Sequence, residues 1–173
     1  RSTQAKTLFP YTTLFRSVYR MRWSILTIAS VLALAYVMNF SGQTIAMGTF
    51  LAGLGTVYAF LAPALGWIGT AVTGSDTSAN ALFAKLQVSA AENLQHAGIH
   101  GATPELMLAA NTTGGVVGKM ISPQSLAIAA TSVDMEGKES DILKAVLPWS
   151  FAMLVVVCIL VFLQTNVLSF LVP

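Results

Sequence analysis

Two long stretches of the chain contain no charged residue. Residues 23–75 and residues 145–173 contain no Asp, Glu, Lys, Arg or His, and apolar side chains fill most of their positions. Because a helix needs about 20 predominantly apolar residues to cross a bilayer, the first stretch is long enough for two spans and a remainder, and the second for one. The pattern therefore predicts an all-α polytopic membrane protein.

Turn signals divide these stretches into three full spans. The first is predicted over residues 23–40, and a Ser-Gly-Gln turn at residues 41–43 separates it from a second span over residues 44–62. Proline has no N–H for the helix ladder, so Pro63 is expected to end or kink the second span. The last span is predicted over residues 145–172.

Residues 64–91 predict a re-entrant helical hairpin. An apolar limb at residues 65–72 is too short to cross a bilayer at 1.5 Å per residue, and the polar run TGSDTS at residues 73–78 has turn chemistry. A second helix-like limb follows at residues 80–91. Irregular backbone at membrane depth is tolerated only where it is buried in protein or lines a cavity, so the tip is expected to be functional.

A discontinuous transmembrane helix is predicted over residues 103–131. Residues 103–105 (Thr-Pro-Glu) and residues 122–124 (Ser-Pro-Gln) both have an N-cap hydroxyl followed by Pro, which marks a helix start. The Thr-Thr-Gly-Gly run at residues 112–115 is expected to interrupt the first of these helices after about Asn111.

The hairpin tip and the helix break predict an anion site. Half-helix N-termini have unpaired N–H groups and a partial positive charge, and transporters use broken helices in this way near the membrane midplane. Helix capping alone is the simpler alternative, but two such breaks in one short chain favour a site for a small hydroxylated anion. The candidate substrate-binding residues are Ser75, Thr77, Ser78, Asn80, Asn111, Thr112, Thr113, Gly114, Gly115, Lys119, Ser122, Pro123 and Gln124.

Two charged residues lie beside these breaks. A carboxylate at membrane depth is costly and is a functional hypothesis by default, so Asp76 is a candidate for carrying a coupling proton or pairing with a cation. Its alternative role is as N-cap of the second hairpin limb. Lys119 is a candidate for attracting a substrate carboxylate or pairing with Asp76, and its alternative is to extend toward the membrane interface.

Composition excludes several other classes of protein. The chain is 55% hydrophobic and only 9% charged, against roughly 25% charged in an ordinary soluble domain. The net charge of +2 gives no basic stripe for nucleic acid, and the single cysteine excludes an internal disulfide or a cysteine-based zinc site.

Catalytic, metal and cofactor sites are not predicted. Residues 113–120 (TGGVVGKM) lack the first glycine and the final Ser or Thr of a phosphate-binding P-loop. His96 and His100 are four residues apart, but Gly98 weakens the helix that would align them. We therefore expect neither an enzyme nor a cofactor.

Residues 1–17 differ from the rest of the chain. Their aromatic, threonine and basic residues show no helical period, and the run TLFPYTTLFRS resembles a translated sequencing-adapter peptide. We interpret residues 1–17 as a non-native addition, with a short native strand or loop as the alternative. On this interpretation the native protein continues upstream of Val18.

Three stretches resemble the L-lactate permease family: residues 66–83 (GWIGTAVTGSDTSANALF), residues 109–130 (AANTTGGVVGKMISPQSLAIAA) and residues 35–42 (AYVMNFSG). The resemblance covers residues 18–173 and implies the carboxyl-terminal part of a multi-pass carrier in the bacterial inner membrane. Such a carrier moves lactate, and often glycolate, together with protons. It implies a missing amino-terminal part, two inverted halves and contact with membrane lipid.

Two alternatives remain open on sequence grounds. A non-transporting membrane scaffold or channel subunit is the second functional hypothesis, although a scaffold has no need to expose backbone in lipid. Arg20 and Arg22 precede the first span, which favours a cytoplasmic amino side. Analogy with carriers whose hairpins enter from outside favours the opposite orientation.

Overall fold

The computed structural model describes residues 11–171, with side chains described for Tyr19, Met21, Arg22 and residues 25–170. All regular secondary structure within this range is helical, as the sequence predicts. The elements are α1 (Tyr11–Phe40), α2 (Gln43–Ala52), α3 (Thr56–Thr73), α4 (Asp76–His96), α5 (Pro104–Lys119), α6 (Pro123–Ser132), α7 (Glu139–Asn166) and a short 3-10 helix (Ser169–Leu171).

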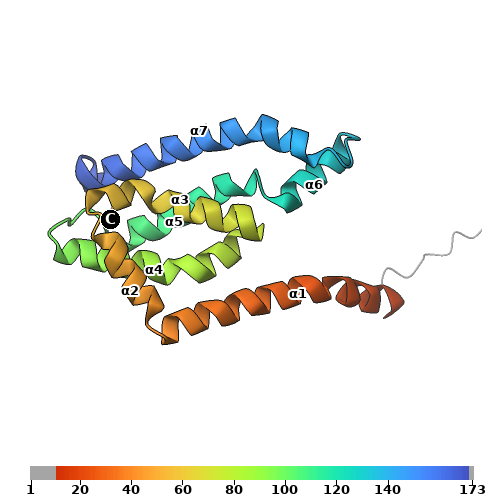
Figure 1. The fold of residues 1–173 in the computed structure, drawn as a ribbon, viewed down its shortest axis with the longest axis horizontal. Coiled ribbons are helices and arrows are strands. Elements are labelled where there is room, and N and C mark those ends of the chain that lie inside the picture. The colour runs from red at the N-terminus through yellow and green to blue at the C-terminus, as the bar shows by residue number, and fades with distance from the viewer. Residues whose placement is uncertain (1–10, 172–173) are drawn as a thin grey trace, which may run out of the picture.

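Three helices form the centre of the molecule. Helices α3, α4 and α5 pack against one another, and α7 packs on α3 and α5 from one side. Helix α1 runs along the opposite side and contacts α4, while the short α2 connects the two layers (Figure 1). The α3–α4 hairpin, and α5 with the α6 that continues it after a break, therefore lie between α1 and α7.

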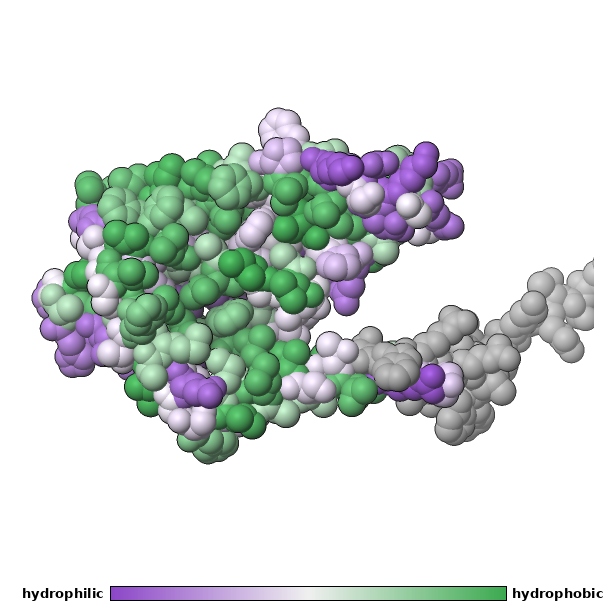
Figure 2. All heavy atoms as spheres, viewed as in Figure 1, coloured by the Kyte–Doolittle hydropathy of each residue, from purple (hydrophilic) through white to green (hydrophobic). Residues whose placement is uncertain are grey.

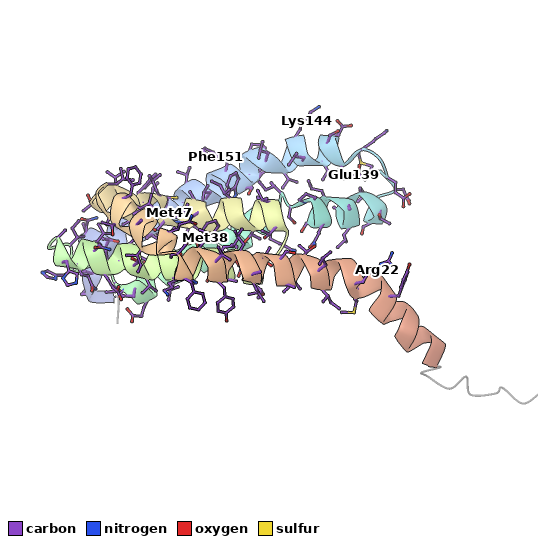
Figure 3. All side chains as sticks on the ribbon, turned by 60° about the horizontal axis from the view of Figure 1, so that its bottom comes forward. Arg22, Met38, Met47, Glu139, Lys144 and Phe151 are labelled. Carbon is purple, nitrogen blue, oxygen red and sulfur yellow. The ribbon has the colours of Figure 1, made fainter. Side chains whose placement is uncertain are left out.

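The distribution of polar residues fits a membrane-crossing bundle. Helices α3 and α7 are long and apolar enough to cross a membrane, and the α1–α2 pair, bent by 74°, counts as a third span if it is taken as one. Apolar residues cover the middle of the visible face, and hydrophilic residues gather over the α6–α7 loop at one end (Figure 2). Arg22, Glu139 and Lys144 lie toward this same end (Figure 3).

The buried core consists mainly of small side chains. Ala59, Ala62, Ala90, Ala91 and Ala110 are at most 1% exposed. Small residues let helices approach closely in lipid, where no hydrophobic force drives helices together. Large apolar side chains instead cover the outside of the bundle, as expected for a surface that faces lipid.

Glycines bring the backbones of α3 and α5 into direct contact. A Cβ atom added to Gly66 would overlap the backbone of Asn111, and one added to Gly114 would overlap the backbone of Pro63. Gly118 lies in the same way against the backbone of Trp67. No side chain separates the two helices along this line.

We expect the substitution Gly114→Ala to destabilise the protein by about 1–3 kcal/mol, because the added methyl meets backbone that cannot give way. This cost outweighs the gain of about 1 kcal/mol that alanine brings to a helix interior. Thermal unfolding in detergent measures the effect. Ala109→Leu, which adds more volume on the exposed side of the same helix, is the control. An unchanged melting temperature for Gly114→Ala would contradict the close contact.

The predicted second span over residues 44–62 is wrong. Helix α2 ends at Ala52, and α3 begins at Thr56 and continues through Pro63. The reason is a turn at residues 53–55 that ends with Gly55 at φ 60, where a residue with a side chain is strained. Pro63 is tolerated inside α3 because neighbouring helices hold a transmembrane helix in place where one backbone bond is lost.

The predicted break at residues 112–115 is also wrong. Helix α5 is continuous from Pro104 to Lys119, and Thr113 Oγ1 donates to the Ala109 carbonyl of its own helix at 2.8 Å. The glycines here serve close packing rather than a turn. The chain leaves the helical path only before Pro123, since a residue that precedes Pro is driven to extended backbone; Ser122 has φ −68 and ψ 145.

The limits of the hairpin and of the last span differ from the prediction. The turn at Gly74 and Ser75 is where the sequence places it, but both limbs are long helices: α3 has 18 residues and α4 has 21. The first limb is therefore a full-length helix rather than a short re-entrant one. Helix α7 begins at Glu139, inside the charged stretch, and ends at Asn166.

Candidate substrate site

The turn between α3 and α4 is built from hydroxyl groups. Gly74 ends α3 with φ 69, and Ser75 caps α4 by accepting a hydrogen bond from the Ser78 N–H at 3.3 Å. Thr73 Oγ1 accepts from the Ser75 N–H at 3.2 Å. Asp76 is the first residue of α4, so its alternative role as the N-cap is wrong: Ser75 is the cap, and the carboxylate is available for other contacts.

The break between α5 and α6 has the same chemistry. Ser122 caps α6 by accepting from the Ser125 N–H at 3.4 Å, and its own hydroxyl donates to the Lys119 carbonyl at 3.0 Å. Pro123 is the first residue of α6, as the sequence predicts.

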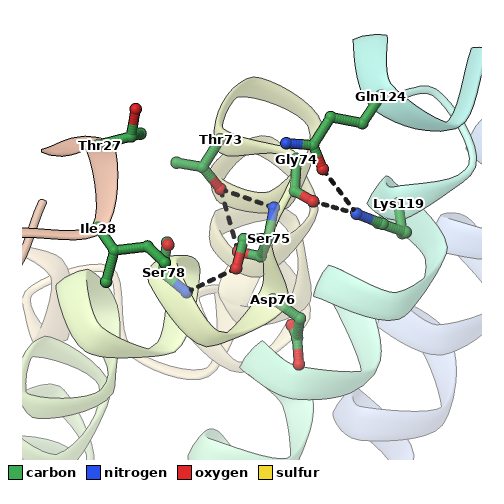
Figure 4. A pocket seen from close by; sticks show the side chains of 9 residues that line it. All are labelled: Thr27, Ile28, Thr73, Gly74, Ser75, Asp76, Ser78, Lys119 and Gln124. Carbon is green, nitrogen blue, oxygen red and sulfur yellow. Dashed lines mark hydrogen bonds between the residues drawn. The ribbon is translucent and has the colours of Figure 1, made fainter. Parts of the chain in front are cut away.

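A lysine joins the two breaks. Lys119 Nζ donates to the Gly74 carbonyl and, at 3.3 Å, to Gln124 Oε1 (Figure 4). The positive φ of Gly74 favours glycine there, and a Cβ atom on it would lie 2.8 Å from Cδ of Gln124. The end of α3 and the start of α6 are thereby held together.

A polar cavity of about 470 Å³ lies at this junction. Such a volume is in the range of small-molecule sites and is ample for an anion of six non-hydrogen atoms. Asp76 and Lys119 are the two charged residues that line it. The lining residues are Thr27, Ile28, Thr73, Gly74, Ser75, Asp76, Ser78, Lys119 and Gln124.

The Asp76 carboxylate points away from Lys119 and toward the space between α4 and α5 (Figure 4). Its Oδ2 accepts from Asn80 Nδ2 at 3.2 Å, and its Oδ1 accepts from Thr70 Oγ1 at 3.4 Å. Gly115 of α5 lies against this carboxylate, so that a Cβ atom on Gly115 would overlap Asp76 Oδ1. Among the described residues Lys119 and Asp76 form no ion pair, although the sequence allowed one.

The structure gathers part of the predicted site residues into two neighbouring groups. Ser75, Ser78, Lys119 and Gln124 line the cavity. Behind Asp76, a second group is joined by hydrogen bonds: Asn111 Nδ2 donates to Asn80 Oδ1 at 2.7 Å, and the Thr112 hydroxyl donates to the same oxygen at 3.2 Å.

Other predicted residues lie outside the cavity. Thr77 faces α1 in a smaller apolar cavity with Val31 and Leu32. Thr113 is turned to its own helix, and Gly114 and Gly115 act through packing against α3 and Asp76. Ser122 and Pro123 begin α6 without lining the cavity.

Sequence reasoning missed three kinds of residue. Thr27 and Ile28 reach the cavity from α1, and no local pattern marks them. Thr70 lies one helical turn before the polar run at residues 73–78, inside the apolar limb. Gln87 was detectable, since Asp76, Asn80 and Gln87 recur at the spacing of one helix face in an otherwise apolar segment.

The sequence profile of the L-lactate permease family matches residues 3–168. The chain belongs to this family. It is 46% identical over 157 residues to an L-lactate permease of Bacillus subtilis (strain 168), a match that covers 91% of this chain and 27% of the relative. It is also 42% identical over 149 residues to the glycolate permease GlcA of Escherichia coli (strain K12), covering 86% of this chain and 26% of that protein.

The L-lactate permease of Escherichia coli (strain K12) is 45% identical over 149 residues, which are 86% of this chain. The chain therefore spans about a quarter of the length of the curated relatives it matches. No solved structure matches it. These relatives are named as permeases and not as enzymes, and with the apolar helices they identify a multi-pass membrane protein. The matched range begins at residue 3, within the stretch interpreted as non-native, whose origin stays a prediction.

Proposed function

We propose that this lactate permease-family chain forms part of a carrier that moves a small 2-hydroxy monocarboxylate, lactate or glycolate, with a proton across the bacterial inner membrane. The observation that carries the proposal is the cavity where the two helix breaks meet, lined by one cationic and one acidic side chain. The names of the relatives, L-lactate permease and glycolate permease, support the substrate class.

The cationic side of the cavity suits a carboxylate. The Lys119 ammonium has three N–H donors, of which two are used by the Gly74 carbonyl and Gln124. The third remains for a substrate oxygen. Ser75 and Ser78, at the start of α4, also line the cavity and offer their hydroxyl groups to a 2-hydroxyl or carboxylate.

The acidic side suits a proton. Asp76 lines the same cavity as Lys119, so a proton taken up by its carboxylate balances the negative charge that a bound monocarboxylate brings. The bound monocarboxylate and the proton together add no net charge to the site. Their joint passage avoids the cost of an unpaired ion in lipid.

We expect Lys119→Gln, in a full-length permease containing this chain, to raise the half-saturation concentration for lactate about ten- to a hundredfold. Loss of a charge-assisted hydrogen bond accounts for this size, since such bonds contribute roughly 1.5–3 kcal/mol. Initial rates of labelled lactate uptake into membrane vesicles measure it.

Lys138→Gln is the matched control, because Lys138 is an exposed lysine at the start of α7. It should leave half-saturation unchanged. If both variants match the unmodified protein, the carboxylate binds elsewhere and the proposed role of Lys119 is wrong. With a pore or scaffold instead of a carrier, unlabelled lactate inside the vesicles would not accelerate the uptake of external labelled lactate.

A further inference from the structure

A continuous chain of buried polar side chains leads from the middle of the bundle to Asp76. Tyr58, Gln87 and Asn111 are at most 1% exposed. The Tyr58 hydroxyl donates to Gln87 Oε1 at 2.6 Å, and Gln87 Nε2 donates to the Ala62 carbonyl at 3.0 Å and to Asn111 Oδ1 at 3.3 Å. These contacts cross α3, α4 and α5 and lie outside the substrate cavity.

The chain continues to the carboxylate through one more amide. Asn111 Nδ2 donates to Asn80 Oδ1 at 2.7 Å, and Asn80 Nδ2 donates to Asp76 Oδ2 at 3.2 Å. Among the described residues no buried side-chain polar atom lacks a hydrogen-bond partner. The oxygen and the nitrogen of each amide in this series therefore both have a hydrogen-bond partner.

The Ala62 carbonyl fixes the direction of every hydrogen bond between Gln87 and Asp76. A backbone carbonyl only accepts hydrogen bonds, so the atom of Gln87 beside it has to be Nε2. Asn111 must then present its oxygen to Gln87 and its nitrogen to Asn80. Asn80 in turn must present its nitrogen to Asp76, and the carboxylate receives an N–H at Oδ2.

This polarity makes the two oxygens of Asp76 different. Oδ2 faces an N–H and has to stay an acceptor, so a proton there would collide with the Asn80 amide hydrogens. Oδ1 faces the hydroxyl of Thr70, and a hydroxyl both donates and accepts. When Oδ1 takes a proton, the Thr70 hydroxyl turns and accepts it, and no other contact changes.

We propose that Gln87, Asn111 and Asn80 are positioning residues that keep Oδ2 of Asp76 unprotonated and direct the coupling proton to Oδ1, beside Thr70. This inference rests on the proposed role of Asp76 in proton coupling. In the step itself one proton from the aqueous side forms an O–H bond on Oδ1, the carboxylate charge is neutralised, and the same proton leaves on the other side. The amides do not titrate, so they orient the carboxyl group and pass no proton.

Among the described residues, the helices packed around Asp76 bring few charged side chains to it. Lys119, from α5, lines the same cavity and bonds the Gly74 carbonyl. On α1 the described charged side chain is that of Arg22, whose guanidinium lies 3.8 Å from the Tyr19 ring centroid. Helices α2 and α3 carry no charged residue.

The test compares Gln87→Met with Tyr58→Phe in a full-length permease, by the pH at which lactate uptake is half-maximal. Both variants remove a buried hydrogen bond from the same chain. Gln87→Met also frees Asn111 and Asn80 to turn over, so that Asn80 accepts from a protonated Oδ2. The protonated form is then favoured, and we expect the half-maximal pH to rise by about one unit, a tenfold change in the protonation equilibrium.

Tyr58→Phe leaves Gln87 anchored on the Ala62 carbonyl, so the half-maximal pH should stay at that of the unmodified protein even if the rate falls. Equal profiles for the two variants would overturn the inference. A flat profile in the unmodified permease, with lactate exchange intact, would instead overturn the proposed proton coupling.

A second variant covers the case in which Gln87→Met does not insert. Thr70→Val removes the hydroxyl that donates to the ionised Oδ1 and that can accept a proton placed there. Because the bond to the ionised oxygen is charge-assisted and the stronger of the two, we expect the half-maximal pH to rise by about one unit and Thr70→Ser to restore it. An unshifted profile for Thr70→Val would overturn the assignment of Oδ1.

Discussion

In a full-length permease containing this chain, Asp76→Asn is expected to reduce gradient-driven lactate uptake to the level of empty vesicles while lactate exchange continues. The asparagine can present its oxygen to Asn80 and its nitrogen to the Thr70 hydroxyl, which are the two partners of the aspartate. It therefore resembles the protonated, neutral aspartate and is permanently in the loaded form. A carrier fixed in this form exchanges substrate but gains nothing from a pH gradient.

Two assays on the same vesicles separate the possible outcomes. One measures labelled lactate uptake under an imposed pH gradient, and the other measures exchange of internal unlabelled lactate for external labelled lactate without a gradient. Loss of both activities would indicate a damaged binding site. Normal gradient-driven uptake would remove Asp76 from the mechanism. Glu92→Gln, an exposed carboxylate on the same helix, is the matched control and should keep both activities.

The chain by itself is expected to show no transport. It spans about a quarter of the length of its relatives, and a carrier needs a site that closes toward each side of the membrane in turn. The exposed apolar faces of α1 and α7 include Val37 at 62%, Phe40 at 87% and Phe151 at 57% exposure, and they are available for further helices as well as for lipid.

Vesicles holding only this chain should take up no more labelled lactate than empty vesicles. Producing the remainder of the permease as a second polypeptide in the same membrane should restore uptake, provided that both pieces insert. A chain that transports lactate alone, with saturation and exchange, would show that the cavity described above is complete.

Local chemistry allowed much of the fold to be predicted. The start of α5 at Thr103 and Pro104, the start of α6 at Ser122 and Pro123, and the turn at Gly74 are all found where capping and turn rules place them. These signals act over a few residues, so one sequence is enough to read them.

The two wrong predictions, the span over residues 44–62 and the break at residues 112–115, have a common physical origin. Glycine has two uses, freedom of the backbone and lack of a side chain, and the sequence does not distinguish them. Gly55 and Gly74 use the first, whereas Gly114 and Gly115 use the second. Only the position of α3 decides between the two, which is why a break was expected in the middle of α5.

In the candidate site, the residues at helix ends were predictable and those supplied by other helices were not. Hydroxyls and charges beside helix ends identified Ser75, Asp76, Lys119 and Gln124. The threonine supplied by α1 and the partners behind Asp76 depend on helices that meet only in three dimensions. Gln87, which sets the polarity of the buried amides, is 25 residues from the carbonyl it bonds.

The backbone contact of α3 with α5 has a mechanical consequence. Sliding of packed helices normally proceeds by small rotamer changes in the side chains between them, and at Gly66, Gly114 and Gly118 there are no such side chains. The two helices therefore move as one rigid body, with Gly74 at the end of α3 and Lys119 at the end of α5 joined at the same end of it. Any rocking between outward-open and inward-open forms must hinge elsewhere, and the chain offers two short hinges at residues 41–42 and 53–55, on either side of α2.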